Sequence, residues 1–427
     1  MHVPRPQRLT VVFLILSLVL CGSARAKEIY SDEEGEKKAD LNLTTKGSSL
    51  LSYNPDDPFL YPVRRSALGL VRARAGLRIR HSDKLNSEFA YEHNARAVSN
   101  GASVSGGGSI LPSFAEAPWR IEQLEWQVMD TTSNFAWRQE VDRALVAYHP
   151  SWGEVTVGRQ AIGLGRGVIF SAVDVFAPFS PLEVDREWRR GVDAARAEYR
   201  LSPTTSAEVM SVFGDTWDDS AMLARVRGYL GEVDGELILG KHAEDAMIGA
   251  VMSTIVKGAE VHAELAGFDT RSDQAGGGFF GHDEGALKGV LGSSYTFDVG
   301  QGLTLLGEYH YSGFGVREAE DAVVRLADPD FQERFLRGDT QILGRHALAA
   351  QLSYPFNSEW SGTLLFLGSP TDGSGVASPG VRWDVSDTTS VTASGFLPWG
   401  EDPSNGRLKS QYGGQPASLF LQVSLYF

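Results

Sequence analysis

The sequence predicts an all-β fold: a transmembrane antiparallel β-barrel of about 18 strands (16–18), with a long loop folded into the lumen. Three observations predict this class. Apolar and polar residues alternate with period two through most of the chain. No run of 18 apolar residues follows residue 26, so no helical membrane span is expected there. Charged residues make up 22% of the chain, which suits a membrane protein only if half of each strand faces water.

Residues 1–26 have the pattern of a cleaved secretory signal peptide. Arg5 and Arg8 precede the ten-residue stretch Val11–Leu20, which is too short to span a membrane, and Ala24–Ala26 gives an A-x-A cleavage site. Cys21 is the single cysteine and follows the large Leu20, so cleavage is favoured over lipidation. The chain after residue 26 then has no cysteine for a disulfide or a thiolate metal site.

Residues 27–66 are polar and acidic, and we expect them to form a flexible periplasmic N-terminal segment. A segment tucked into the barrel mouth is the alternative. The transmembrane β-barrel is expected to occupy residues 67–427.

The first expected strand carries an arginine row on one face. Apolar residues occupy alternate positions from Val71 to Ile79, and the positions between them include Arg72, Arg74, Arg78 and Arg80. An arginine at the bilayer midplane costs about 2–4 kcal/mol, so this face must meet water or acids. Glu88 and Glu92 share a face of the next strand and are expected to neutralise part of the row.

Similar alternating segments continue to the C-terminus, which gives 18 expected strands with both termini on the periplasmic side. Those after residues 71–96 are expected at about 119–130, 134–148, 152–160, 191–201, 204–214, 221–231, 234–243, 245–256, 258–268, 286–298, 302–313, 342–354, 358–368, 376–386, 389–397 and 416–427. The charged residues of these strands add candidate pore-lining side chains: Arg196, Arg200, Arg225, Arg227, Glu260 and Glu264. Arginines that stay unpaired would favour anions, and adjacent acids would cancel this preference.

The long segment 161–190 is too apolar for a free surface loop and also dense in charge. We expect it to fold back into the barrel, with its apolar side on the wall and its charges at the pore. The candidate constriction-loop residues are Arg159, Arg166, Asp174, Asp185, Arg186, Glu187, Arg189 and Arg190. They would create a transverse field that favours polar or ionic solutes, or an ion-pair network that holds the loop, and the two roles are compatible.

Two further patterns in the long loops are explained without a ligand. Gly163, Gly165 and Gly167 do not have the G-x-G-x-x-G spacing of a nucleotide site. The segment 314–341 has helix-like patches, and its acids at 328, 330 and 333 do not have the EF-hand spacing. We therefore expect 314–341 to be a solvated extracellular loop without calcium.

The C-terminal segment 417–427 alternates strictly and ends on Phe427. Together with the signal peptide, this ending resembles Gram-negative outer-membrane proteins, whose terminal strand is a recognition tag for the barrel-assembly machinery. The stretch from Val157 to Ala194 also resembles general porins and alginate-export-like proteins, the former with a constriction loop at this place. The resemblance covers about 40 residues and the general barrel pattern.

The resemblance implies a porin-like channel of the bacterial outer membrane, for passive passage of small polar or anionic solutes. A dedicated conduit for an anionic polysaccharide and a plugged structural barrel remain as alternatives. Expected partners are outer-membrane lipid, lipopolysaccharide and, through Phe427, the assembly machinery. The net charge of −15 argues against nucleic acid. No cofactor or metal is expected, and the histidines at 262, 310 and 346 lie in no catalytic motif, so no enzyme is expected.

Overall fold

A computed structural model describes residues 27–32, 36–99, 110–112, 117–132, 134–270 and 285–427. The expected signal peptide 1–26 lies outside these residues. The strands are β1 Lys27–Ser31, β2 Lys38–Tyr53, β3 Arg65–Ser82, β4 Leu85–Val98, β5 Glu125–Thr132, β6 Phe135–Tyr148, β7 Gly153–Gln160, β8 Val192–Ser202, β9 Thr205–Val212, β10 Ala221–Leu230, β11 Val233–His242, β12 Asp245–Val256, β13 Ala259–Asp269, β14 Gly285–Phe297, β15 Leu303–Ser312, β16 His346–Pro355, β17 Trp360–Gly368, β18 Gly375–Ser386, β19 Thr389–Trp399 and β20 Ala417–Tyr426. A 3₁₀ turn (Ala319–Asp321) and two short helices, α2 Ala322–Leu326 and α3 Pro329–Arg337, lie between β15 and β16.

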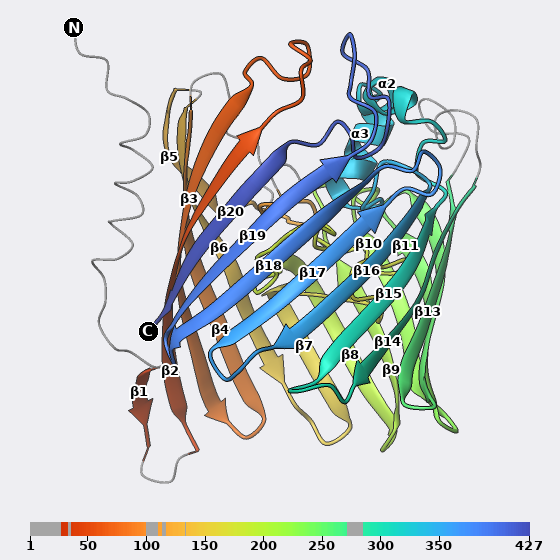
Figure 1. The fold of residues 1–427 in the computed structure, drawn as a ribbon. Helices are drawn as coiled ribbons and strands as arrows, with labels where there is room; N and C mark the ends of the chain where they lie inside the picture. The colour runs from red at the N-terminus through yellow and green to blue at the C-terminus, as the bar shows by residue number, and fades with distance from the viewer. Residues whose placement is uncertain (1–26, 33–35, 100–109, 113–116, 133, 271–284) are drawn as a thin grey trace, which may run out of the picture.

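Eighteen of these strands form a closed antiparallel barrel (Figure 1). Consecutive wall strands pair from β2 to β20, with β4 paired directly to β6, and β20 pairs back to β2. The other two strands pair at one edge only, β1 with β2 and β5 with β6. Closure leaves no free wall edge, which is the condition for a sheet to exist in lipid.

The prediction of a flexible segment over residues 27–66 is wrong for residues 38–53. Residues 38–53 form β2, which pairs with β3 from Lys38 to Tyr53 and with β20 from Thr44 to Tyr53. The strand therefore closes the barrel, and the wall begins at Lys38 rather than at residue 67. A polar strand belongs in a barrel wall because one of its faces meets the lumen.

The expected number of wall strands, 18, is confirmed, but one of the expected strands is not a wall strand and one wall strand was not expected. The expected strand 119–130 corresponds to β5, which pairs with β6 between Phe135 and Glu140. The wall partner of β6 on that side is β7, which pairs only with residues 144–148. The extra strand β5 thus continues the sheet where the short β7 ends, and β2 takes its place in the count.

The two ends of the barrel differ in the length of their connections (Figure 1). At the lower end the turns have two to five residues. One of them, between β12 and β13, places Lys257 at φ 51° and Gly258 at φ 86°, the positive values that tight hairpin turns require. The long segments 161–191, 313–345 and 400–416 all lie at the opposite end.

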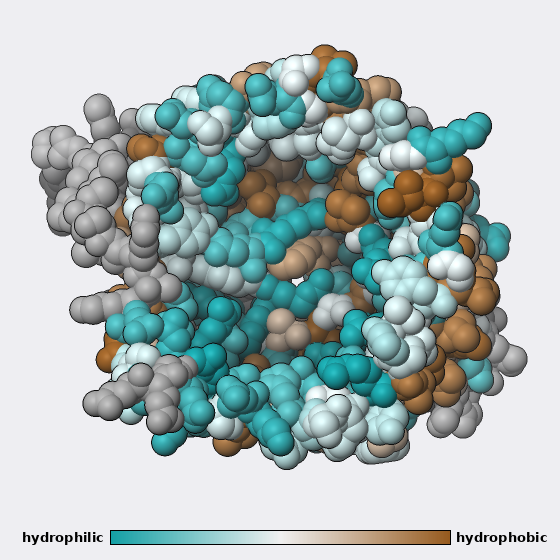
Figure 2. All heavy atoms as spheres, turned by 90° about the horizontal axis from the view of Figure 1, so that it is seen from below, coloured by the Kyte–Doolittle hydropathy of each residue, from teal (hydrophilic) through white to brown (hydrophobic). Residues whose placement is uncertain are grey.

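The wall separates an apolar outside from a polar inside. Outward side chains such as Leu237, Ile248 and Leu291 are 58–66% exposed. Seen from the short-turn end, the molecule is hollowed, and hydrophilic residues line the hollow (Figure 2). Among the described residues, no helix has the length and apolar character needed to cross a bilayer.

Candidate pore constriction

Segment 161–191 leaves the fifth wall strand, β7, and returns to the sixth, β8, after crossing the barrel interior. At one end of its path it contacts β13 and β15, and at the other it contacts β2 and β3. These two pairs of strands lie nearly opposite each other in the 18-strand wall. We call residues 161–191 the constriction loop.

The first wall contact is the carboxylate of Glu264 on β13. One oxygen accepts the backbone N–H groups of Arg166 and Gly167. The other accepts the Ser171 hydroxyl and the Ala172 N–H, both at 2.7 Å. Because Glu264 is buried, these donors replace the water that an ionised carboxylate needs.

Glu308 on β15 holds the intervening stretch in the same way. Its oxygens accept the N–H groups of Val168, Ile169 and Phe170 at 2.6–3.0 Å. The Nε2 atom of His262 lies 3.1 Å from the same carboxylate. We call Glu264 and Glu308 the carboxylate clamp, because together they satisfy most of the backbone donors of residues 166–173.

The clamp requires the backbone bend at Gly165, whose φ is +86°. A Cβ atom there would lie 2.3 Å from Glu264 Oε1. We therefore expect Gly165→Ala to weaken the clamp, at a cost of about 1–3 kcal/mol from backbone strain plus the displacement of Glu264. Limited proteolysis of the folded barrel should show faster cleavage within 161–191. Gly231→Ala is the control, since Gly231 also has positive φ, at 65°, but open space around it. Equal resistance of both variants would contradict the clash.

The far end of the constriction loop is held by ion pairs. Lys46 on β2 is buried and lies 2.6 Å from Asp185 and 2.7 Å from Glu187. Arg72 on β3 binds Glu92 at 2.8 Å and approaches Asp185 at 3.4 Å. The ring of Trp188 lies 4.1 Å from the Lys46 ammonium. A buried lysine needs this double neutralisation.

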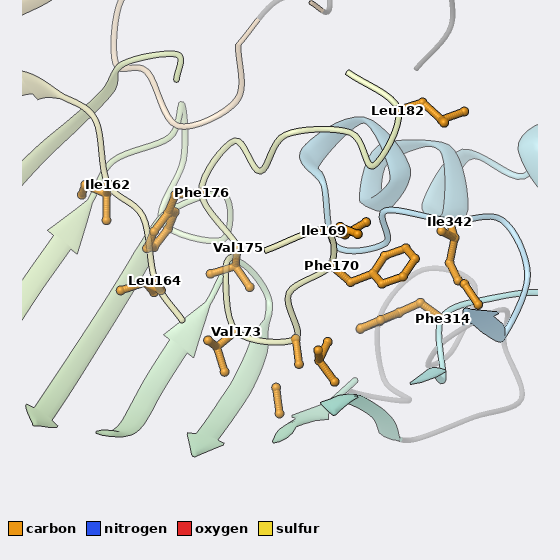
Figure 3. Packing of buried hydrophobic residues seen from close by; sticks show 14 of the residues in the cluster. Ile162, Leu164, Ile169, Phe170, Val173, Val175, Phe176, Leu182, Phe314 and Ile342 are labelled. Carbon is orange, nitrogen blue, oxygen red and sulfur yellow. The ribbon is translucent and has the colours of Figure 1, made fainter. Parts of the chain in front are cut away.

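The apolar side chains of the loop pack as expected. Phe170, Val173, Val175 and Phe176 are fully buried, whereas Val168 is half exposed. Figure 3 shows Phe170 beside Phe314 and Ile342, where the constriction loop meets segment 313–345. The two long loops thus form one packed body inside the barrel mouth.

Segment 313–345 is more buried than a solvated loop. Asp328, one of the three acids noted in the sequence, caps α3 by accepting the N–H groups of Asp330 and Phe331. Arg334 and Arg337 of α3 are buried and bind Asp245 and Glu244 of the β11–β12 region together with Asp339. The expected solvated loop is therefore corrected to a loop anchored on the wall, while its helix-like patches are confirmed.

A cavity of about 450 Å³ lies between the two loops and the wall. Its lining includes Arg72, Arg138, Arg190, Glu92, Glu140 and Glu183. Burial raises the pKa of Glu183 to about 7, against the opposing effects of the Ser180 N–H, Arg72 and Arg186. Burial and the neighbouring Arg120 and Arg138 lower the pKa of Arg190 to about 10. The cavity therefore holds both signs of charge at close quarters.

The candidate pore-lining arginines are mostly paired with acids. Arg74 binds Asp142, Arg78 lies 3.4 Å from Glu88, and Arg227 lies 2.9 Å from Glu198. Arg196 and Arg225 both bind Glu208. Arg80 and Arg200 lie exposed near the short-turn end. Of the candidate acids, Glu260 lies 3.1 Å from His262, and Glu264 belongs to the clamp. The expected neutralisation of the arginine row is present in the structure.

Seven of the constriction candidates lie in the loop, and their partners are close. Arg166 binds Asp234 on β11, and Arg189 lies 2.7 Å from Asp174. Arg186 donates to the carbonyls of Val168 and Pro181, and Arg190 lies 3.8 Å from Glu140. Asp185 and Glu187 bind Lys46. The geometry is that of an ion-pair network that holds the loop.

Arg159 is placed elsewhere, which corrects its assignment to the constriction. It shares the outward face of β7 with Val157, which is 53% exposed. Its guanidinium lies 2.7 Å from Asp193 and donates to the carbonyls of Glu122 and Gln123. The segment that precedes β5 thus supplies two acceptors to the guanidinium of this ion pair.

Several residues of the site were not expected from the sequence. The missed groups are Lys46, Arg138, Glu140, Asp142 and Glu308. Each except Lys46 lies at an inward position of an expected strand, so charge on the polar face was the available signal. The three strand histidines have local partners: Glu260 and Glu308 flank His262, Phe170 stacks on His310, and the Tyr309 hydroxyl lies 2.7 Å from His346.

Comparison with known proteins finds similarity in structure only. No protein-family model and no curated protein sequence matches the chain. Acinetobacter baumannii OccAB1 has a TM-score of 0.57 at 9% identity over 95% of this chain and 99% of that chain. A. baumannii OccAB4 has a TM-score of 0.56 at 10% identity over 93% and 100% of the two chains. A BenF-like porin from Pseudomonas fluorescens Pf-5 has a TM-score of 0.56 at 10% identity over 91% and 98%. The chain therefore has the β-barrel fold of Gram-negative outer-membrane porins, as its sequence predicts.

Proposed function

We propose that this protein is a porin-like channel of the bacterial outer membrane, for passive passage of small polar or anionic solutes. The observation that carries the proposal is the clamped loop in a polar lumen. The 18-strand wall has an apolar exterior, and barrels of 16–18 strands enclose an aqueous channel. The constriction loop occupies part of this channel, and a cavity remains beside the loop.

Planar-bilayer recording tests the proposal. Residues 27–427, refolded in detergent, are expected to give stable conductance steps in a salt gradient. The proposal fails if heat-modifiable, folded protein inserts into the bilayer without any steps. Arg72→Glu and Arg166→Glu should shift the reversal potential, because the first reverses a charge beside the constriction loop and the second reverses a charge within it.

Anion preference should rise as the pH falls, because Glu183 lies at the cavity with a pKa of about 7. Between pH 8 and pH 5.5 its carboxylate becomes neutral, whereas Arg72 and Arg190 stay charged. Since the folded pKa is raised, the contribution of Glu183 to stability is present at low pH and is lost as the pH rises from 4.5 through about 7. Reversal potentials at the two pH values give the measurement. Glu183→Gln should at pH 8 resemble the unmodified channel at pH 5.5, and an unchanged pH response in this variant would assign the effect to another acid.

A plugged structural barrel is the second candidate function. It is favoured by the packing of the constriction loop against segment 313–345, with Phe170, Phe314 and Phe331 fully buried. Conductance separates the two candidates, because a plugged barrel would insert and remain silent.

The proposed location in the outer membrane also requires export of the chain and assembly of the barrel. We propose that residues 1–26 direct secretion and that the assembly machinery recognises the strand ending in Phe427. In the folded chain the end of this strand is paired, since Phe427 and Leu43 on β2 form two backbone hydrogen bonds, at 2.7 and 2.9 Å. Any recognition of Phe427 would precede that pairing. We also propose that the protein is a channel and not an enzyme.

A further inference from the structure

We propose that the inner wall formed by β16–β20 and β2 is a hydrogen-bonding track for uncharged, polyhydroxylated solutes of sugar size. This inference rests on the proposed channel function and names the solute class that the lumen favours. Serine, threonine and glutamine make up about half of the side chains that point inward on these strands. We call this surface the hydroxyl wall.

Strand register aligns these side chains in rows across the wall. In one row Ser353, Thr363 and Ser394 follow one another on β16, β17 and β19, with Gly380 of β18 between the last two. A Cβ atom at Gly380 would lie within 3.1 Å of both the Thr363 and Ser394 hydroxyls, so these oxygens converge over the glycine.

A second row runs through Thr392 on β19, Gln422 on β20 and Ser48 on β2. The inward direction is fixed by parity. On β19 Phe396 is buried and Leu397 is 57% exposed, and on β20 Phe420 is buried and Leu419 is 55% exposed. Thr392 and Gln422 share the buried parity and therefore face the lumen.

Part of the hydroxyl wall is open to a passing solute. Thr363 is exposed, and Ser361 and Thr392 are partly exposed. Within the described part of the chain, the hydroxyls of these three residues make no hydrogen bond. Each hydroxyl donates one hydrogen bond and accepts two, so it can bind water or a sugar hydroxyl in several orientations. Weak, repeated binding of this kind permits passage rather than capture.

Several charged side chains on the hydroxyl wall and across from it are paired with opposite charges. Across from the hydroxyl wall, Glu208 on β9 binds Arg196 and Arg225, and Glu236 on β11 approaches Arg225 at 3.4 Å. On the hydroxyl wall itself, Arg382 and Asp384 pair with each other at 2.8 Å, and Lys46 is neutralised by the constriction loop. Paired charges attract a charged solute only weakly, and they do not repel a neutral one.

The cavity and the hydroxyl wall share the inward face of β17. Leu367 lines the cavity and has the same inward parity as Thr363 and Ser361 further down the strand. The amides of Asn94, Gln341 and Gln411 also line the cavity, and they donate and accept hydrogen bonds as hydroxyls do. The cavity thus offers neutral hydrogen-bonding groups beside its charged ones.

Liposome swelling with three sugars of one ring size tests the proposal. Glucose, glucuronate and glucosamine differ in charge and little in size. Proteoliposomes of the refolded chain 27–427 should admit glucose about three- to tenfold faster than either charged sugar. The triple variant Ser361→Ala, Thr363→Val, Thr392→Val should lower glucose entry by a similar factor, because three small hydrogen-bond contributions are lost. Its KCl conductance should stay close to that of the unmodified channel.

Thr45→Val is the matched control. Thr45 lies on the outward parity of β2 with Leu43 and Leu51, so its loss should leave glucose entry unchanged. Equal entry of all three sugars, or a triple variant that admits glucose normally, would overturn the hydroxyl-wall proposal while KCl conductance still supports a channel. Absence of both conductance and swelling would instead overturn the proposed function.

Discussion

Deletion of residues 27–53 is expected to abolish folding of the barrel. This deletion removes β2, which pairs with β3 over its whole length and with β20 over ten residues. Without it, β3 and β20 each present an unpaired edge to lipid, where every unsatisfied backbone group costs several kcal/mol. Heat-modifiable gel mobility and far-ultraviolet circular dichroism of the refolded chain 54–427 give the measurement.

Deletion of residues 27–37 is the matched control, because it removes only β1. That strand pairs with the first residues of β2 and takes no part in closing the wall. The shortened chain 38–427 should fold and conduct like the chain 27–427. A heat-modifiable, conducting barrel from residues 54–427 would show that β3 and β20 can close directly, and the role assigned to β2 would then be wrong.

Glu264→Ala is expected to have the largest effect of any single substitution at the constriction. It leaves four backbone N–H groups, those of Arg166, Gly167, Ala172 and Val173, without their acceptor. The Ser171 hydroxyl loses its acceptor as well. Each buried unsatisfied donor costs about 1–3 kcal/mol, so residues 166–173 should leave the wall rather than stay unpaired. Single-channel recordings should then show altered mean conductance and strongly increased open-channel noise.

Two further substitutions test whether the effect of Glu264→Ala comes from the loss of a charge or from the loss of an acceptor at this position. Glu264→Gln keeps one acceptor oxygen and should have a smaller effect than Glu264→Ala. Glu260→Gln alters a partly exposed carboxylate on the same strand that binds His262 and no residue of the constriction loop. Its noise should match that of the unmodified channel. Equal noise in Glu260→Gln and Glu264→Ala would mean that the clamp does not hold the loop.

Most of the wall follows from period-two alternation, and β2 shows where that signal ends. Its outward face contains Thr45, Gly47 and Ser49 between Leu43 and Leu51, and its inward face contains Lys46 and Ser48. The two faces differ little in polarity, so alternation is weak. Pairing with the C-terminal strand, for example between Ser48 and Gln422, which are 374 residues apart, identifies β2 as a wall strand.

The constriction loop was predictable from its composition, but its attachment was not. Glu264 is identifiable as an inward acid on β13, yet its donors lie 91–98 residues earlier in the chain. Backbone N–H groups carry no sequence signal, so the clamp becomes visible only in three dimensions. Arg159 shows the opposite error, because its charge suggested the lumen while the parity of β7 turns it outward.

The most direct test of a loop held inside the lumen is a disulfide between that loop and the wall. The chain 27–427 contains no cysteine, so a pair can be introduced alone. A Cβ atom at Gly249 on β12 would lie 3.0 Å from Val173 Cγ1 in the constriction loop, a separation compatible with a disulfide after substitution. The variant Val173→Cys, Gly249→Cys should therefore oxidise fully in the folded barrel and keep its conductance, because the bond fixes a position that the loop already holds. Thiols that remain free in the folded barrel under oxidising conditions would contradict the clamped loop.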